Sequence, residues 1–286
     1  MTGMWAEFRH TLRRLRGQIL GWGSGLALYG LAMGLMYDAI QNITGLDEML
    51  ASYPRELLAF FGDMADLASA RGYFGVYYSS YMPIIAGIFA VGAASALLAG
   101  DEERGTLDLT LAQPIGRSAL FGGRWLGFVA ATTLILFIGY LGWVVTLPFS
   151  ALDVTAGALL AAFVPILGML LLFGGLSLLL SMVLPSARSA SMTAGGLLVA
   201  NWLLVGLANL NPDLQPIVDL TPFAYFQGGE SLVDMNWGWA GGLIAVGFVL
   251  AAVAWFLFRR RDIRVGGERS WNLRGAILPN RAAPGR

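Results

Sequence analysis

The sequence predicts an all-α integral membrane protein with six transmembrane helices, and three observations support this. The chain is 57% apolar and only 13% charged, whereas soluble proteins carry about 25% charged residues. Its charges cluster between uncharged blocks, each long enough for the roughly 20 residues that cross a bilayer of about 30 Å. Its arginines are also distributed unequally between the connecting segments. Helices are the default because backbone groups in lipid must pair internally.

The chain divides into three parts. Residues 1–16 carry Trp5, Phe8, Leu12 and Leu15 with arginines between them, which predicts an amphipathic helix lying in the cytoplasmic membrane interface. A signal peptide is the alternative, but the following apolar run is long enough to span and more spans follow. The transmembrane domain, 17–258, is expected to have spans at about 17–37, 74–99, 124–148, 156–183, 190–210 and 237–258. Residues 259–286 form a basic tail.

The distribution of arginine predicts the orientation. Every one of the 18 basic residues is Arg, and sixteen of them fall in 1–16, 100–124, 184–189 and 259–286. Only Arg55 and Arg71 lie in the other connecting segments. Because cytoplasmic loops carry the excess of positive charge, both termini are expected to be cytoplasmic in a multi-pass protein of the cell membrane.

The composition excludes several kinds of chemistry. There is no cysteine, which rules out disulfides and thiolate sites, and no metal site is expected around the single histidine, His10. Without lysine the chain lacks the Gly-x-x-x-x-Gly-Lys-Ser/Thr element that binds ATP, and no catalytic residue is expected. The spans hold no Asp, Glu, Lys, Arg or His away from their ends, which argues against proton coupling. Sodium coupling through neutral groups stays open.

Residues 100–123 form a charged island between two apolar blocks. An acidic cluster, Asp101-Glu-Glu103, precedes Arg104-Gly-Thr-Leu107, and Pro114-Ile-Gly-Arg117 follows. A short helix parallel to the membrane would present the charges to a soluble partner, and charges at a rim steer association. Gly105 would allow a sharp turn and Pro114 would end the element. An ordinary solvated loop is the alternative interpretation.

This order of residues resembles the first intracellular loop of type-2 ABC exporter permeases, the membrane subunits of ATP-driven transporters. Their loop reads roughly Glu-x-x-x-Gly-Thr-Leu-x-x-Leu-Leu-x-x-Pro-x-x-Arg and carries the coupling helix that touches the ATPase subunit. Thr110 departs from the pattern, because the family usually has an apolar residue there. The resemblance implies coupling residues Asp101, Glu102, Glu103, Arg104, Gly105, Thr106, Leu107, Asp108, Pro114 and Arg117.

The same resemblance implies the partners. Two permease chains, identical or different, would assemble in lipid with two ABC ATPase subunits, which would bind ATP and Mg. This chain would hold no cofactor of its own and no nucleic acid, and a prokaryotic source is expected. Such exporters work by alternating access. A secondary transporter or channel, or a membrane scaffold or assembly factor, is the alternative.

Spans two and five line the central pathway of such exporters. The residues that these spans offer here are Tyr77, Tyr78, Ser80, Tyr81, Thr193, Asn201 and Trp202. Aromatic residues near a span end are also membrane-interface anchors, and an interhelical hydrogen bond is the other explanation for Asn201. The apolar interior suggests a lipid-like or amphipathic substrate.

Two further features concern packing and the outer surface. Residues 211–236 are too polar and proline-rich to span, and the resemblance suggests a short re-entrant element in the outer leaflet. Small residues recur at spacing four in the first span, at Gly17, Gly21 and Gly25, and again at Gly30 and Gly34. They predict close helix packing within the chain, with a dimer interface as the alternative.

Overall fold

The computed structural model describes residues 2–43, 67, 69–107 and 115–260. The described residues form helices and turns, with no strand. Six helical segments are long and apolar enough to cross a membrane: Gly3–Gln41, Ala70–Ser95, Arg117–Phe149, Ala156–Val183, Ala187–Ala208 and Trp237–Arg260. The predicted all-α, six-span fold is confirmed.

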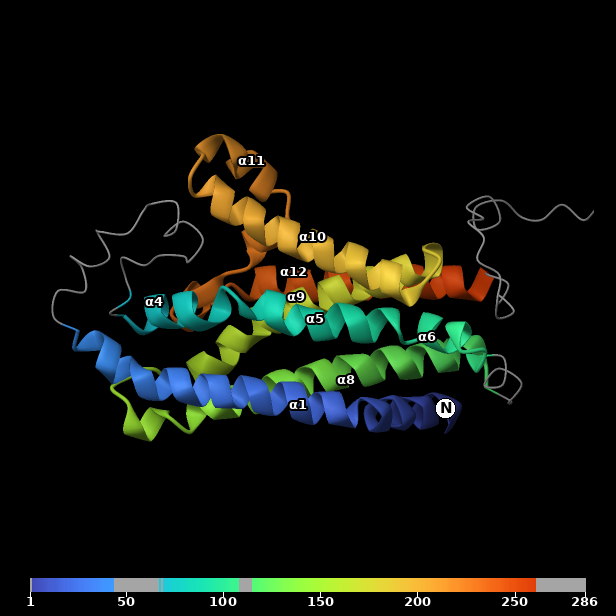
Figure 1. Ribbon diagram of the computed structural model, residues 1–286, viewed down its shortest axis with the longest axis horizontal. Coiled ribbons are helices and arrows are strands. Elements are labelled where there is room, and N and C mark those ends of the chain that lie inside the picture. The colour runs from blue at the N-terminus through green and yellow to red at the C-terminus, as the bar shows by residue number, and fades with distance from the viewer. Residues whose placement is uncertain (1, 44–66, 68, 108–114, 261–286) are drawn as a thin grey trace, which may run out of the picture.

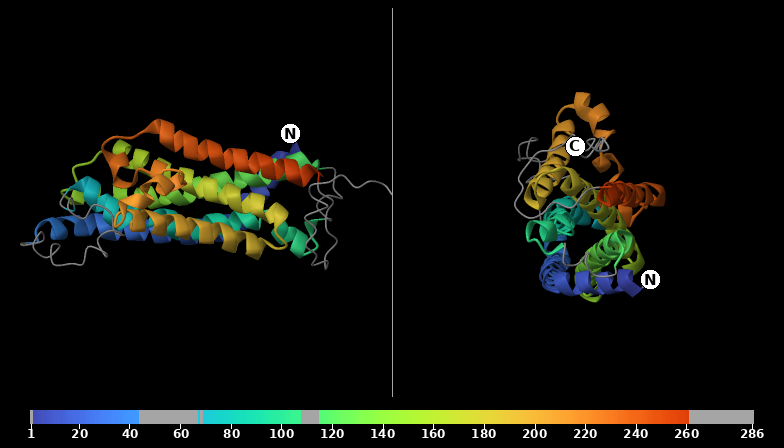
Figure 2. Two further views of the ribbon diagram at one scale, coloured as in Figure 1. Left: turned by 90° about the horizontal axis from the view of Figure 1, so that it is seen from above. Right: turned by 90° about the vertical axis from the view of Figure 1, so that its right-hand side faces the viewer.

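The first span is part of one long helix, α1, which runs for 40 residues from Thr2 to Gln41 (Figure 1). No break separates the predicted interfacial segment 1–16 from the span, because this part of the chain contains no proline. The N-terminal part of α1 nevertheless turns away from the long axis and runs across the end of the bundle (Figure 2). This is the direction expected of a helix that follows a membrane surface.

The second span is interrupted. It consists of α4 (Ala70–Phe74), a π-helical turn η2 (Gly75–Ser79) and α5 (Met82–Ser95). Pro83, at the start of α5, has no N–H to continue the previous helix. The hydroxyl of Ser80 donates to the carbonyl of Gly75 at 2.6 Å, which satisfies an acceptor at the irregular turn. A short helix, α6 (Ala99–Glu103), follows at the opposite end of the bundle from α4 (Figure 1).

Helix α9 (Ala156–Val183) lies at the centre of the molecule. It packs against α5 and against α8 (Arg117–Val144), α10 (Ala187–Ala208) and α12 (Trp237–Arg260). The crossing with α12 is close because two glycines meet there: a Cβ on Gly175 would lie 2.5 Å from the carbonyl oxygen of Gly247. A 3₁₀ turn, η3 (Leu147–Phe149), precedes α9.

Helix α1 packs mainly on α8, and the glycines that allow this belong chiefly to α8. A Cβ on Gly142 would lie 2.2 Å from the carbonyl oxygen of Ala27, and one on Gly123 would lie 2.5 Å from that of Met4. On α1 itself, Gly30 and Gly34 fit against side chains of α8 and of the turn after it, as predicted. The prediction of packing within the chain is wrong for three residues, where a Cβ would meet no atom within 4 Å: Gly17, Gly21 and Gly25.

The segment between α10 and α12 holds only short elements. They are η4 (Pro212–Leu214), α11 (Gln215–Val218), η5 (Pro222–Tyr225) and η6 (Gly228–Leu232). The α11 region stands out from the bundle, whereas η6 packs on α9 and α4 (Figure 1). Arg71 Nη1 of α4 and Glu230 Oε1 of η6 form an ion pair at 2.8 Å. None of these elements is long enough to span, and their place relative to a membrane stays a prediction.

The two ends of the bundle differ in charge. The N-terminus of α1, α6, the starts of α8 and α10 and the end of α12 gather at one end (Figures 1 and 2). We call this the arginine-rich end. The arginines described there are Arg9, Arg13, Arg14, Arg16, Arg104, Arg117, Arg124, Arg188, Arg259 and Arg260. Segments far apart in sequence therefore meet as the arginine distribution predicted.

Candidate coupling site

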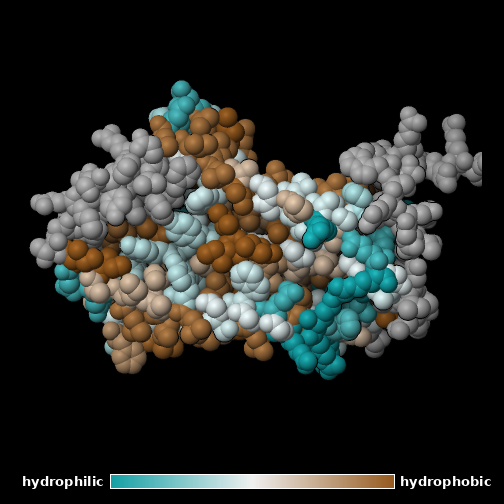
Figure 3. All heavy atoms as spheres, in the orientation of Figure 1, coloured by the Kyte–Doolittle hydropathy of each residue, from teal (hydrophilic) through white to brown (hydrophobic). Residues whose placement is uncertain are grey.

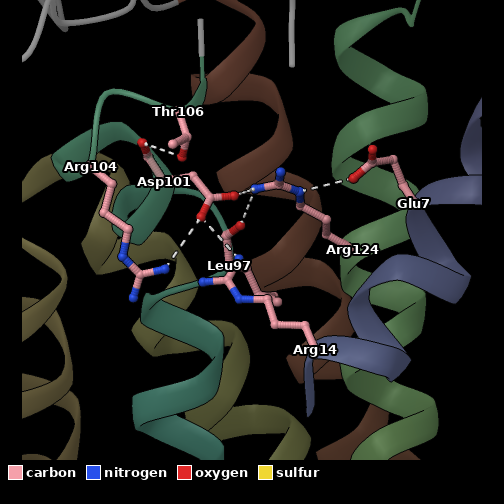
Figure 4. Close-up of polar contacts among 7 residues, drawn as sticks. All are labelled: Glu7, Arg14, Leu97, Asp101, Arg104, Thr106 and Arg124. Atoms are coloured by element: carbon pink, nitrogen blue, oxygen red, sulfur yellow. Dashed lines mark hydrogen bonds and ion pairs between the residues drawn. The ribbon is translucent and has the colours of Figure 1, made fainter. Parts of the chain in front are cut away.

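The acidic cluster begins on α6, and its first carboxylate points into the protein. Asp101 Oδ2 lies 2.7 Å from Nη1 of Arg124 on α8, and Asp101 Oδ1 lies 3.0 Å from Nη1 of Arg14 on α1 (Figure 4). The Asp101 side chain is only 11% exposed. This single residue therefore joins the end of the second span to both α1 and α8.

Arg124 is the most enclosed member of this group, with a side chain 4% exposed. Its Nε lies 3.2 Å from Glu7 Oε2 on α1, and its Nη1 also donates to the carbonyl of Leu97. A buried guanidinium is tolerated only where carboxylates and carbonyls satisfy it, because desolvating a charge costs several kcal/mol. The group Glu7, Arg14, Asp101 and Arg124, which we call the ionic cluster, fixes three helices at the arginine-rich end.

The third acid, Glu103, points toward another helix. Its Oε1 accepts a hydrogen bond of 2.6 Å from the backbone N–H of Ala187, the first residue of α10. Ser186 and Ser189 complete the cap of α10 with a reciprocal pair of hydrogen bonds. A carboxylate is favourable at a helix N-terminus because free N–H groups and the helix dipole attract it. Glu103 thereby connects the loop after span two to span five.

The chain turns sharply after α6, as Gly105 was expected to allow. Gly105 has φ +67°, in the left-handed region that glycine enters without strain. Thr106 N–H then donates to the carbonyl of Asp101 at 2.9 Å, which closes the turn. Arg104 stands at the surface with a side chain 67% exposed and its Nη1 4.0 Å from Asp101 Oδ1. Leu107 is buried.

The structure therefore divides the predicted coupling residues. Asp101 and Glu103 contact other helices of the same chain, Glu102 is partly exposed, and Arg104 and Thr106 are exposed. Arg117 begins α8 and reaches the carbonyl of Arg259 at 3.4 Å. Asp108 and Pro114 lie outside the described residues.

The sequence did not predict the role of Arg124 or Glu7. From the sequence, Arg124 is only one more cytoplasmic positive charge, and no pattern distinguishes Glu7. A signal was present, however, because Arg124 is followed directly by an apolar span. An arginine at such a position needs an acidic partner. One partner, Glu7, is 117 residues away in sequence, and the other, Asp101, lies on a different helix, so no local pattern identifies either of them.

The predicted pathway residues differ in how far they are buried and in what they contact. The rings of Tyr81 and Trp202 lie tilted against each other at a centroid distance of 6.2 Å, which brings spans two and five together at a distance from the arginine-rich end. Tyr78 is fully buried against Trp143 and Phe163, so its side chain reaches no surface of a single chain.

The remaining pathway candidates lie on or near these helices. Tyr77 is half-buried and packs on Tyr73, and Thr193 is exposed on α10. The Asn201 amide donates to the carbonyl of Leu197 in its own helix at 2.7 Å, which is a local bond and no bond to another helix. Among the described residues, no three acidic or histidine side chains cluster as a metal site would require.

Comparison with known proteins identifies the family. Residues 8–259 match the model of a family described as "Multidrug efflux system permease Rv1217c, C-terminal domain". The chain belongs to this family of ABC transporter permeases. It is also similar to the "Probable ABC transporter permease protein NosY" of Pseudomonas aeruginosa, with 31% identity over 215 residues, which cover 64% of this chain and 76% of the relative. The match includes every described member of the ionic cluster except Glu7.

As an ABC permease, the chain is a membrane-spanning transport subunit and not itself the ATPase subunit. The resemblance inferred from the loop after span two therefore led to the right family.

Proposed function

We propose that this permease is the membrane subunit of an ATP-driven exporter, and that residues 99–107 receive the motion of a separate ATPase subunit. One observation supports the proposal most strongly: α6 is exposed at its tip, yet ion pairs and a hydrogen bond connect it to three spans, α1, α8 and α10. Arg104 faces outward, whereas Asp101 contacts α1 and α8, and Glu103 contacts α10. A displacement of this short element must therefore displace those helix ends or break their charged contacts.

Through the hydrogen bond between Glu103 and Ala187, a motion of α6 would reach α10. Helix α10 has little of its surface buried within the chain, and α5 packs beside it. Tyr81 and Trp202 join these two spans at the other end. A movement that enters at Glu103 would shift α10 relative to α5, which is the change that alternating access between spans two and five needs.

The remaining parts of the proposal follow from the charge distribution and the family. The arginine-rich end lies in the cytoplasm, where the ATPase subunits bind ATP and Mg. Two ATPase copies and a second permease chain complete the transporter in the cell membrane. A lipid-like or amphipathic substrate passes between spans two and five. The short elements from η4 to η6 lie at the outer leaflet as a re-entrant segment.

Two variants of the loop after span two distinguish docking of the ATPase from transmission of its motion to the spans. Arg104→Ala removes the exposed charge and should weaken binding of the ATPase, by about 2–5 kcal/mol if the contact is desolvated. A solvated loop would change by only about 0–1 kcal/mol. Glu103→Gln should leave ATPase binding intact, because its carboxylate lies on α10 within the chain. Arg188→Ala, an exposed arginine on α10 at the same end, is the matched control.

The experiment that tests transmission from α6 to α10 can be done without knowing the substrate. The chain has no cysteine, so Met192→Cys on α10, where the native side chain is 71% exposed, accepts a single spin label. In the reconstituted complex, ATP should change the spectrum of this label, and Glu103→Gln should abolish or reduce the change. A full ATP response in Glu103→Gln, or unchanged ATPase affinity in Arg104→Ala, would remove the corresponding residue from the mechanism.

A further inference from the structure

A groove runs along the molecule between α1 and α5, and Arg14 of the ionic cluster lines one end of it. It encloses about 420 Å³, a volume within the range of roughly 300–1,000 Å³ typical of ligand sites. Its walls come from one face of α1 and from the C-terminal half of α5. The two helices barely touch each other. Figure 3 shows their face of the molecule, where strongly hydrophilic side chains gather at the arginine-rich end beside hydrophobic ones along the bundle.

The two ends of this groove differ in character. Arg14 and Arg104 line the end nearest α6. Trp22 lies eight residues further along α1 than Arg14, and Ile88 of α5 lines the same apolar part. At 1.5 Å per helical residue, the groove therefore extends about 12 Å from charged groups into apolar surroundings. This is the shape of a site for a molecule with a charged head and an apolar chain.

The floor of the apolar part is open. Gly92 and Ala93 of α5 line it, and a Cβ placed on Gly92 would meet no atom within 4 Å. Ile88 beside it is 62% exposed. Small side chains leave room here that the rest of the bundle fills, so a hydrocarbon chain can lie along α5 without displacing protein atoms.

The charged end presents an exposed guanidinium group. Asp101 pairs with Arg124 at 2.7 Å and with Arg14 at 3.0 Å, and both of these contacts lie inward. Arg104 is the most exposed of the three arginines, with a side chain 67% exposed and its guanidinium 4.0 Å from the same carboxylate, so it is the one most open to an anion from outside the protein. Positive pockets between spans at the cytoplasmic surface attract anionic lipid head groups.

We propose that the α1–α5 groove is a binding site for an anionic phospholipid of the leaflet at the arginine-rich end. Its phosphate lies against Arg104 and Arg14, and one acyl chain lies over Gly92 between Trp22 and Ile88. The lipid fills the space between two spans that make few contacts of their own, and it touches the exposed arginine of the loop after span two. This site goes beyond the coupling role and is measured on the permease alone.

The test uses the full chain in detergent, with phosphatidylglycerol and phosphatidylcholine of the same acyl chains as probes. Native mass spectrometry counts bound lipid, and titration gives Kd. Phosphatidylglycerol should bind more tightly than phosphatidylcholine, and Arg104→Gln should weaken it about fivefold, the effect of one arginine near a membrane surface. Arg188→Gln should not, although it removes the same charge from the same end.

A second variant tests the apolar part. Gly92→Leu fills the floor with a side chain that meets no protein atom at its Cβ, and it should reduce binding of both lipids while the arginines remain. Gly242→Leu on α12, at a glycine that is equally open, should have no effect. The proposal is overturned by equal effects of the two arginine variants, by equal effects of the two leucine variants, or by glycerol phosphate competing as well as the whole lipid.

Discussion

At the scale of single residues, the decisive feature is a guanidinium group enclosed where a span begins. Arg124 has two carboxylates and a backbone carbonyl around it. Such a group adds little net stability when it is paired, because desolvation offsets the attraction. Its importance appears when one member is removed, since the others are then left buried without a partner.

Replacing Arg124 should therefore be strongly destabilising. Arg124→Gln leaves Glu7 and Asp101 with only Arg14 and the exposed Arg104 as described counter-charges, and we expect a loss of about 3–5 kcal/mol. The unfolding of the detergent-solubilised permease, followed by circular dichroism, measures this loss. Arg188→Gln on the surface should change stability by less than about 0.5 kcal/mol.

A second substitution distinguishes the cluster from a general loss of packing. Glu7→Gln added to Arg124→Gln removes one of the stranded carboxylates, so the double variant should be less destabilised than the sum of the two single variants. Additive losses would show that Glu7 and Arg124 do not act as a pair.

At the scale of elements, the seam between α1 and α8 shows what periodicity predicts and what it does not. The small residues of the first span predicted close packing, and Gly30 and Gly34 do face the α8 side. Gly17, Gly21 and Gly25 have the same spacing but face away from the chain. Spacing identifies a face of a helix, whereas only the fold decides which neighbour that face meets.

A pair of alanine substitutions measures this difference. Gly142→Ala places a Cβ 2.2 Å from the carbonyl oxygen of Ala27, so α1 and α8 must move apart, at a cost of about 1–3 kcal/mol. Gly25→Ala has open space and should be neutral or slightly stabilising, because alanine favours a helix by about 1 kcal/mol over glycine. Equal melting temperatures for the two variants would contradict the close crossing of α1 and α8.

The helices themselves were largely predictable from sequence, and their irregularities were not. Helix α9 occupies the predicted interval 156–183, because its apolar block is bounded by polar segments on both sides. The π-helical turn at Gly75–Ser79 has no such local signal. Glu103 was predicted to face a partner. The structure places its carboxylate on the N-terminus of α10, a contact that no local pattern reveals because it depends on the folding of a segment 84 residues away.

At the scale of the whole molecule, the arrangement of helix ends makes the membrane orientation testable. Ser118 lies at the arginine-rich end, and Val233, 74% exposed, lies at the other. In intact cells, an impermeant thiol reagent should label Val233→Cys and spare Ser118→Cys, since arginine-rich segments stay in the cytoplasm. Ser231 is unsuitable as a reporter because it is only 2% exposed. Labelling of Ser118→Cys from outside would reverse the orientation.

The central claim is that the exposed tip of the loop after span two meets a P-loop ATPase. Cysteine cross-linking tests it most directly, because the chain has no native cysteine. Thr106→Cys, at the exposed turn after α6, leaves Arg104 in place. This variant and Val233→Cys, at the opposite end, are each treated with a short bifunctional thiol reagent in the co-purified complex. The account predicts a permease–ATPase cross-link from position 106 and none from position 233. Absence of an ATPase from the purified complex, or equal cross-linking from the two positions, would contradict it.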